Sequence, residues 1–97
     1  MKKWRAEGGW RKQLDADLRR GFGITADDYE RMLAEQSNVC AICGKVNVDN
    51  RRLAVDHGHT TGAVRGLLCS PCNRGIGFFG DDPVAMERAA AYVRSYA

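Results

Sequence analysis

The sequence lacks any long hydrophobic run. No stretch is apolar enough to cross a membrane, and Met1–Trp4 is followed by charged and glycine residues instead of the apolar region of a secretory signal. We therefore expect no membrane partner and a cytoplasmic location. In that reducing compartment, paired cysteines bind metal more often than they bind each other.

Internal repeats and low-complexity segments are absent too. With 97 residues, of which 44% are hydrophobic and 28% charged, the composition is that of one globular domain. A chain this small buries a thin core, so bound metal would contribute folding energy. We expect a single domain (1–97) made of an N-terminal helical segment (1–36), a central core (37–80) and a C-terminal helix (81–97).

No single charge sign dominates. The formal net charge is +3, and four thiolates with one Zn²⁺ would change it by about −2, leaving about +1. Basic residues gather in 1–20 and again in the central segment, whereas 21–36 is acidic. The pattern suits a basic face laid on phosphates with an acidic helix turned away, and equally a mixed solvated surface.

Four cysteines form two Cys-x-x-Cys pairs, Cys40/Cys43 and Cys69/Cys72. One tight turn lets two thiolates share a metal, and structural zinc takes four such ligands in a tetrahedron. Two disulfides are the alternative, which a reducing compartment disfavours. The spacing therefore predicts a structural zinc site.

The first part of the chain predicts two helices. Leu14 and Leu18 lie at helical spacing within Gln13–Arg20. Thr25 and Asp28 have the spacing of a capping box that opens a second helix. This second helix has an apolar stripe, which we expect in the core: Tyr29, Met32 and Leu33. Trp4 and Trp10 could stack on bases or on a partner, but anchoring the N-terminal segment is the favoured use.

The central part predicts two strands followed by a helix. Leu53–Asp56 alternates as a strand, and Val64–Leu68 reads as its partner. Pro71 suits the first turn of the following helix. With zinc tying both ends, this order brings Asn73 up against Asp56 and His57.

The C-terminal part predicts one more helix. Asp82 and Pro83 cap it, and its apolar stripe consists of Met86, Ala89, Ala90 and Val93. These mostly short side chains predict close packing of the helix on the domain.

The central segment resembles the endonuclease VII branch of the HNH, or His-Me finger, nucleases. Four motifs carry the resemblance in order: Cys40–Gly44, Asp56–His59, Val64–Cys69 and Cys72-Asn73. It implies an α+β fold, a small zinc-stabilised ββα-metal domain with flanking helices. It also implies a DNA substrate, products with 3′-hydroxyl and 5′-phosphate ends, a divalent cation beside the zinc, and a phage or mobile-element origin.

The residues themselves suit phosphodiester hydrolysis. His57 can act as general base, because a neutral imidazole accepts a proton from water near pH 7. Asp56 and Asn73 offer hard oxygen ligands for catalytic Mg²⁺ or Mn²⁺. The alternatives are an Asp-His pair that only orients neighbours and an asparagine that only bonds backbone. Neighbouring strand residues point to opposite sides, so the strand must end or twist at Asp56-His57.

Further side chains are assigned on position. His59 either contacts phosphate, orients the site or helps hold the cation, or it is a turn residue. Arg74, next to Asn73, is the favoured phosphate contact. Arg65 could clamp a phosphate or be a surface charge, and Arg51 and Arg52 belong to the same basic stretch. Gly66 is expected where the backbone passes close to a neighbour or to DNA.

Two departures limit what the resemblance implies. Some relatives carry a further carboxylate one helical turn after the asparagine, where this chain has Ile76. Junction-resolving relatives also assemble as two-fold dimers through extended helical segments, so a homodimer is considered alongside a monomer. Nicking or double-strand cutting is therefore as well supported as junction resolution.

We interpret the chain as a metal-dependent DNA endonuclease, acting in the host cell if the gene is carried by a phage. The first alternative is a zinc module that binds nucleic acid without cutting it. The second is a zinc-bearing adaptor for another protein. Neither alternative needs Asp56, His57 and Asn73 together.

Overall fold

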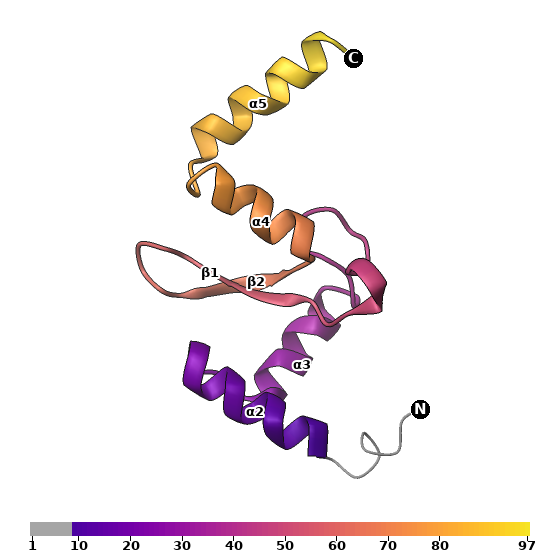
Figure 1. The fold of residues 1–97 in the computed structure, drawn as a ribbon, viewed down its shortest axis with the longest axis vertical. Helices are drawn as coiled ribbons and strands as arrows, with labels where there is room; N and C mark the ends of the chain where they lie inside the picture. The colour runs from indigo at the N-terminus through magenta and orange to yellow at the C-terminus, as the bar shows by residue number, and fades with distance from the viewer. Residues whose placement is uncertain (1–8) are drawn as a thin grey trace.

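A two-stranded hairpin crosses the middle of the molecule, with two helices on one side and two on the other (Figure 1). The computed structural model describes residues 9–97, so Trp4 lies outside the described residues. The elements are α2 (Gly9–Phe22), α3 (Ala26–Glu35), the 3₁₀ turn η1 (Val48–Asn50), β1 (Ala54–His57), β2 (Val64–Leu68), α4 (Ser70–Phe78) and α5 (Pro83–Ser95). Over the described residues the fold is α+β, as predicted.

Helix α2 contains the predicted segment but begins four residues earlier, at Gly9. Trp10 lies one helical turn before Leu14 and Leu18 and packs, partly buried, against the same core. It extends one apolar stripe by a turn, which explains the earlier start and the anchoring expected of this residue. The helix ends at Phe22, before Gly23 with φ of 73°.

Helix α3 begins at the predicted capping box. The Thr25 hydroxyl accepts from the Asp28 N–H at 3.0 Å, and the Asp28 carboxylate accepts from the Thr25 N–H at 2.9 Å. Tyr29 is buried, and its hydroxyl donates to the Leu53 carbonyl at 2.6 Å. This bond joins α3 to the residue before β1, and Met32 and Leu33 pack against the same core.

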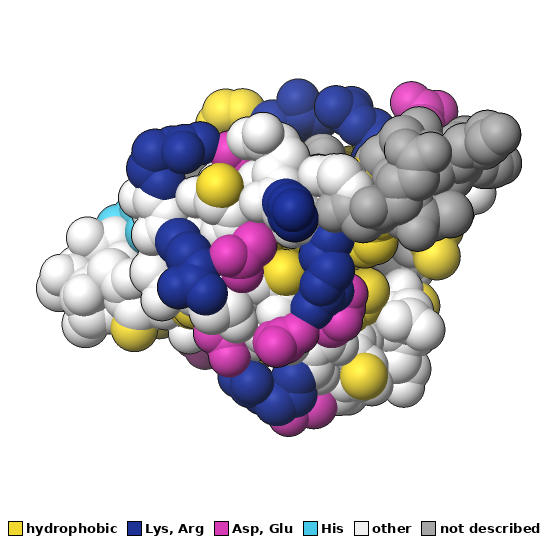
Figure 2. Space-filling view, turned by 90° about the horizontal axis from the view of Figure 1, so that it is seen from below, with side chains coloured by type: hydrophobic (Ala, Val, Ile, Leu, Met, Phe, Trp, Pro, Cys, Tyr) yellow, Lys and Arg dark blue, Asp and Glu magenta, His cyan; other side chains and the backbone are white. Residues whose placement is uncertain are grey.

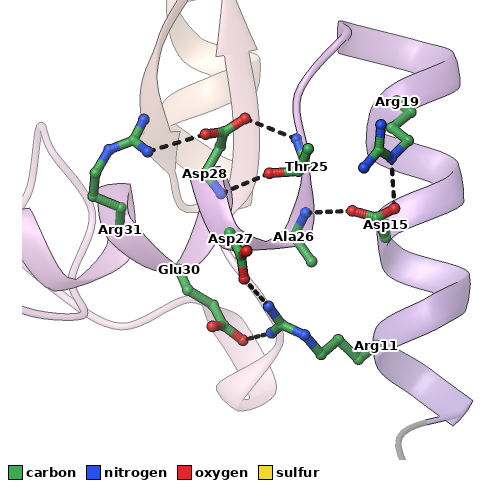
Figure 3. Close-up of polar contacts among 9 residues, drawn as sticks. All are labelled: Arg11, Asp15, Arg19, Thr25, Ala26, Asp27, Asp28, Glu30 and Arg31. Carbon is green, nitrogen blue, oxygen red and sulfur yellow. Dashed lines mark hydrogen bonds and ion pairs between the residues drawn. The ribbon is translucent and has the colours of Figure 1, made fainter.

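The charges of α2 and α3 pair with one another. Arg11 bonds both Asp27 and Glu30, and Asp15 accepts from the Ala26 N–H at 2.8 Å and from Arg19 at 2.6 Å (Figure 3). Figure 2 shows Lys and Arg interleaved with Asp and Glu on this end of the molecule. At this end of the molecule the charges therefore form a mixed surface, and a basic face laid on phosphates elsewhere stays a prediction.

The core lies between the two N-terminal helices and the hairpin. It is formed by Leu14, Leu18, Ala26, Tyr29, Cys40, Leu53, Leu67, Leu68 and Cys69. Gln36, just past α3, accepts from the Leu67 N–H and donates to the Leu67 carbonyl, both at 2.9 Å. A Cβ on Gly66 would lie 3.3 Å from the Gln36 amide oxygen. The close backbone approach predicted for Gly66 is therefore confirmed.

Strand β2 has the predicted bounds, and β1 is displaced by one residue, to Ala54–His57. The strands pair antiparallel, with Ala54 opposite Leu68 and Asp56 opposite Gly66. Helix α4 begins directly after β2, with Pro71 in its first turn as predicted. The hairpin and α4 therefore meet at the residues predicted to form the site.

Helix α5 begins where the sequence indicates, with the Asp82 carboxylate accepting from the Val84 N–H at 3.0 Å. It extends away from α4 and contains no buried residue (Figure 1). Val93 is 64% exposed, so the predicted close packing of the whole stripe is wrong. The early turn does contact the domain, since Met86 lines a pocket with Ile76 and Leu68. The contact ends because the helix axis leads away from the body.

Candidate active site and metal centre

The four cysteines converge on one point. All four sulfurs lie within 4.8 Å of one another, and the Cys43 and Cys69 sulfurs are 3.7 Å apart. A tetrahedral zinc with Zn–S bonds of about 2.3 Å holds its sulfurs about 3.8 Å apart, whereas a disulfide needs about 2.05 Å. The cysteines are all free thiols. The geometry therefore fits one tetrahedral zinc ion and not disulfides.

The ionisation of the thiols also suits a dication. Burial opposes charge on Cys40, but N–H groups of the knuckle backbone outweigh it and lower the pKa of Cys40 to about 6. Burial and the neighbouring thiols raise the pKa of Cys72 to about 12. Cys40 forms a thiolate readily, whereas Cys72 resists ionisation beside it, which is the situation that a bound cation relieves.

Asn47, which sequence reasoning missed, lies buried next to the four-cysteine cluster and bonds the residue after Cys69. It is buried, and its amide oxygen accepts from the N–H groups of Val48 and Ser70, each at 2.8 Å. Its amide nitrogen donates to the Arg52 carbonyl at 2.9 Å. The side chain thus ties the segment before β1 to the start of α4, beside Cys69. A lone asparagine between two valines was the only signal in the sequence.

The hairpin is irregular at Asp56-His57, as predicted. Asp56 pairs with Gly66, but His57 pairs with Val64, so Arg65 is an extra residue on β2. Such a bulge re-aims side chains at the point where it occurs. Asp56 is buried while His57 is exposed, yet both line one small pocket.

That pocket brings together the predicted catalytic residues. It has a volume of about 160 Å³ and lies between β1 and α4. Its polar lining consists of Asp56, His57, His59 and Asn73. Ile76 and Gly77 complete it from the next turn of α4. The carboxylate, the amide and the imidazoles form a donor set that fits a hard divalent cation.

The ring of His57 contacts two other rings, one tilted and one edge-on. Its centroid lies 5.5 Å from that of Phe22 and 5.8 Å from that of His59. Phe22 is the last residue of α2, so this ring contact joins the N-terminal helices to the site. Within residues 9–97, no group hydrogen-bonds the imidazole of His57. The only signal for Phe22 in the sequence is its place near the end of the helix.

Asp56 is held by Arg65. The guanidinium donates to both Asp56 carboxylate oxygens, at 2.7 and 3.0 Å, and also to both oxygens of Asp81, at 2.9 and 3.0 Å. Asp81 is also 3.7 Å from Nδ1 of His59. Sequence reasoning missed Asp81, which lies in the turn between α4 and α5. The only available signal was its place beside the Asp82 helix cap.

The arginines predicted to bind DNA lie in different surroundings. Arg51, Arg52 and Arg74 are exposed, and the structure gives none of them an acidic partner within residues 9–97. Arg51 and Arg52 border a separate pocket beside Tyr29 and Asn47. Arg65 forms ion pairs with Asp56 and Asp81. Its role as a phosphate contact stays a prediction.

Together these features define a class: a small α+β protein with a four-cysteine metal site and a polar pocket where a hairpin meets a helix. Residues 15–95 match the sequence profile of the family described as recombination endonuclease VII, and the chain belongs to that family. None of the helices formed by residues 9–97 is long and apolar enough to cross a membrane.

Two curated relatives come from phages. The chain is 45% identical to Gene 59 protein of Mycobacterium phage D29 over 74 residues, which are 75% of this chain and 45% of the relative. It is 42% identical to Gene 59 protein of Mycobacterium phage L5 over 73 residues, 74% of this chain and 44% of that relative. The chain thus spans about half the length of the curated relatives it matches. No solved structure matches it with significance.

Proposed function

We propose that the chain is a metal-dependent DNA endonuclease that hydrolyses phosphodiester bonds. The observation that carries the proposal is the pocket that gathers Asp56, His57, His59 and Asn73 at the meeting point of the hairpin and α4. Family membership supports the same reaction class. The family's description supports DNA as the substrate, and the similarity to phage proteins supports action in a host cell.

The roles follow from the side chains. His57, which has no hydrogen-bond partner within residues 9–97, takes the proton of the attacking water as general base. Asp56 and Asn73 hold Mg²⁺ or Mn²⁺ through a carboxylate and an amide oxygen. A cation bound there would supply positive charge for the phosphate oxygens. His59 is exposed and lines the same pocket, where it contacts phosphate, orients the site or helps hold the cation.

The remaining assignments complete the proposal. A structural zinc on Cys40, Cys43, Cys69 and Cys72 holds the first knuckle to the start of α4, and so holds Asn73 near Asp56. Arg74, Arg51 and Arg52 are exposed cations available to the DNA backbone. Cleavage would leave 3′-hydroxyl and 5′-phosphate ends. The reaction would be nicking, double-strand cutting or junction resolution, by a monomer or a homodimer.

Incubation with supercoiled plasmid tests the function directly. Zinc-loaded protein with added Mg²⁺ or Mn²⁺ is expected to convert the plasmid to nicked or linear forms on a gel. Chelation of the added cation should stop the reaction before zinc is lost, because thiolates hold zinc more firmly than oxygen ligands hold Mg²⁺. A protein that shifts DNA in a binding assay but leaves it uncut with every cation would favour the non-catalytic zinc module instead.

Removing a cation ligand should change the metal dependence of cleavage. Asp56→Asn keeps the size of the side chain but loses the charge, and we expect activity to fall by about 100-fold or more. Asn73→Ala should lose less, and raised Mg²⁺ should partly restore it, since a neutral ligand contributes less to cation affinity. The measurement is cleavage rate against Mg²⁺ concentration. An unchanged metal dependence in both variants would contradict the assigned ligands.

A further inference from the structure

Arg65 lies between two carboxylates that come from different parts of the chain. Asp56 ends the buried part of β1, and Asp81 lies in the turn after α4. Each carboxylate receives two hydrogen bonds from the guanidinium, at 2.7 to 3.0 Å. The Asp81 side chain is 16% exposed and that of Asp56 is 11% exposed, so the cluster is only partly open to solvent.

The backbone builds this cluster from two irregular positions. The bulge makes Arg65 an extra residue on β2, which lets its side chain turn toward Asp56. Asp81 has φ of 64°, and its N–H donates to the Ile76 carbonyl at 3.0 Å where α4 ends. Aspartate and asparagine tolerate this left-handed conformation better than other residues with a side chain do. The bulge directs Arg65 toward Asp56, and the left-handed backbone at Asp81 places that carboxylate within reach of Arg65.

The charges explain why two carboxylates are needed. A guanidinium held by Asp56 alone would cancel the charge that attracts a divalent cation to that carboxylate. Asp81 restores a net charge of −1 to the three groups. The ion pairs are mutual: the bonds to Asp56 and then Asp81 raise the pKa of Arg65, and the bonds from Arg65 lower the pKa of Asp81.

We infer that Asp81 is a positioning residue of the proposed nuclease, which shares the Arg65 guanidinium so that Asp56 is held in place yet keeps its affinity for a divalent cation. Arg65 then fixes the orientation of the Asp56 carboxylate, and Asp81 prevents the arginine from closing onto it. The inference rests on the proposed function of Asp56 as a cation ligand.

The test measures binding of Mn²⁺ to zinc-loaded protein, from the electron paramagnetic resonance signal of the free ion. Asp81→Asn is expected to raise the Kd for Mn²⁺ about two- to fivefold, because one partly exposed charge pair is lost. Asparagine suits the left-handed backbone, so zinc content and melting temperature should stay close to the wild-type values. In the plasmid assay, the Mg²⁺ concentration for half-maximal cleavage should rise by a similar factor while the rate at saturating Mg²⁺ recovers.

Asp82→Asn is the matched control. It removes the same charge one residue away, and asparagine caps a helix as well as aspartate does. Asp82 accepts from the Val84 N–H and makes no ion pair among the described residues. Its Kd for Mn²⁺ should therefore stay near the wild-type value.

Arg65→Gln separates positioning from simple charge. If Asp81 acts by sharing Arg65, Asp81→Asn should change the Kd less in the Arg65→Gln background than in the wild type. An equal change in both backgrounds would overturn the positioning role, and so would equal Kd values for Asp81→Asn and Asp82→Asn. A wild-type protein that binds no Mn²⁺ would overturn the proposed cation site itself, together with the inference built on it.

Discussion

Replacing His57 with alanine is expected to lower the rate of DNA cleavage by about 10²–10⁴-fold, the usual contribution of a general base. The ring lies in the pocket beside Asp56 and Asn73 and has no hydrogen-bond partner among the described residues. It can therefore accept a proton from a water bound in the pocket. Because a general base acts mainly in the transition state, affinity for uncut DNA should change little.

Single-turnover cleavage of plasmid and a separate binding assay with Ca²⁺ measure these two quantities. His59→Ala serves as the comparison, since His59 is an exposed histidine of the same pocket with its ring centroid 5.8 Å from that of His57. We expect a smaller loss for it. Wild-type cleavage by His57→Ala would transfer the role to His59, and loss of zinc or of the fold would make His57 a structural residue.

Stripping the zinc is expected to abolish the cooperative melting transition. Two of the nine core residues, Cys40 and Cys69, belong to the four-cysteine cluster that could hold the metal. The knuckles also join the segment after α3 to the first turn of α4, and Cys43 and Cys69 are 26 positions apart in the sequence. In a chain with so small a core, metal binding energy becomes folding energy.

Elemental analysis should find one zinc per chain, and phenanthroline should remove both the metal and the melting transition. Cys72→Ser should show the same loss without a chelator, because serine is a poor zinc ligand. Protons compete with zinc for the thiolates, so zinc affinity should fall as the pH is lowered. A metal-free protein that keeps its full transition would show that the fold does not depend on the site.

Local features of the fold were predictable because their signals are local. The Thr25–Asp28 capping box, the apolar spacing of Leu14 and Leu18, and Pro71 at the start of α4 each act within one or two helical turns. The two Cys-x-x-Cys pairs predicted the metal site for the same reason, since each pair positions two ligands by itself. The single domain, with its segments divided at 36 and 80, remains a prediction.

Long-range packing was predictable only in part. The apolar stripe of α5 indicates a helix but not its direction, and Val93 proved exposed because the helix leads away from the body. The acidic residues of α3 indicate no partner either, and Arg11 reaches two of them from α2. Such pairings depend on how two helices cross, which periodicity in one helix does not specify.

By itself, the sequence determined the four-cysteine cluster, the hairpin followed by a helix, and the residues Asp56, His57 and Asn73 as one group. These depend on motifs whose spacing already restricts the backbone. Only the tertiary structure decided that Arg65 lies between Asp56 and Asp81, that the Phe22 ring contacts His57, and that Asn47 ties the loop before β1 to α4. Each of these contacts joins separate segments of the sequence. Their relative placement depends on packing, and for Arg65 also on its unpaired position in β2. A local sequence pattern does not specify such placement.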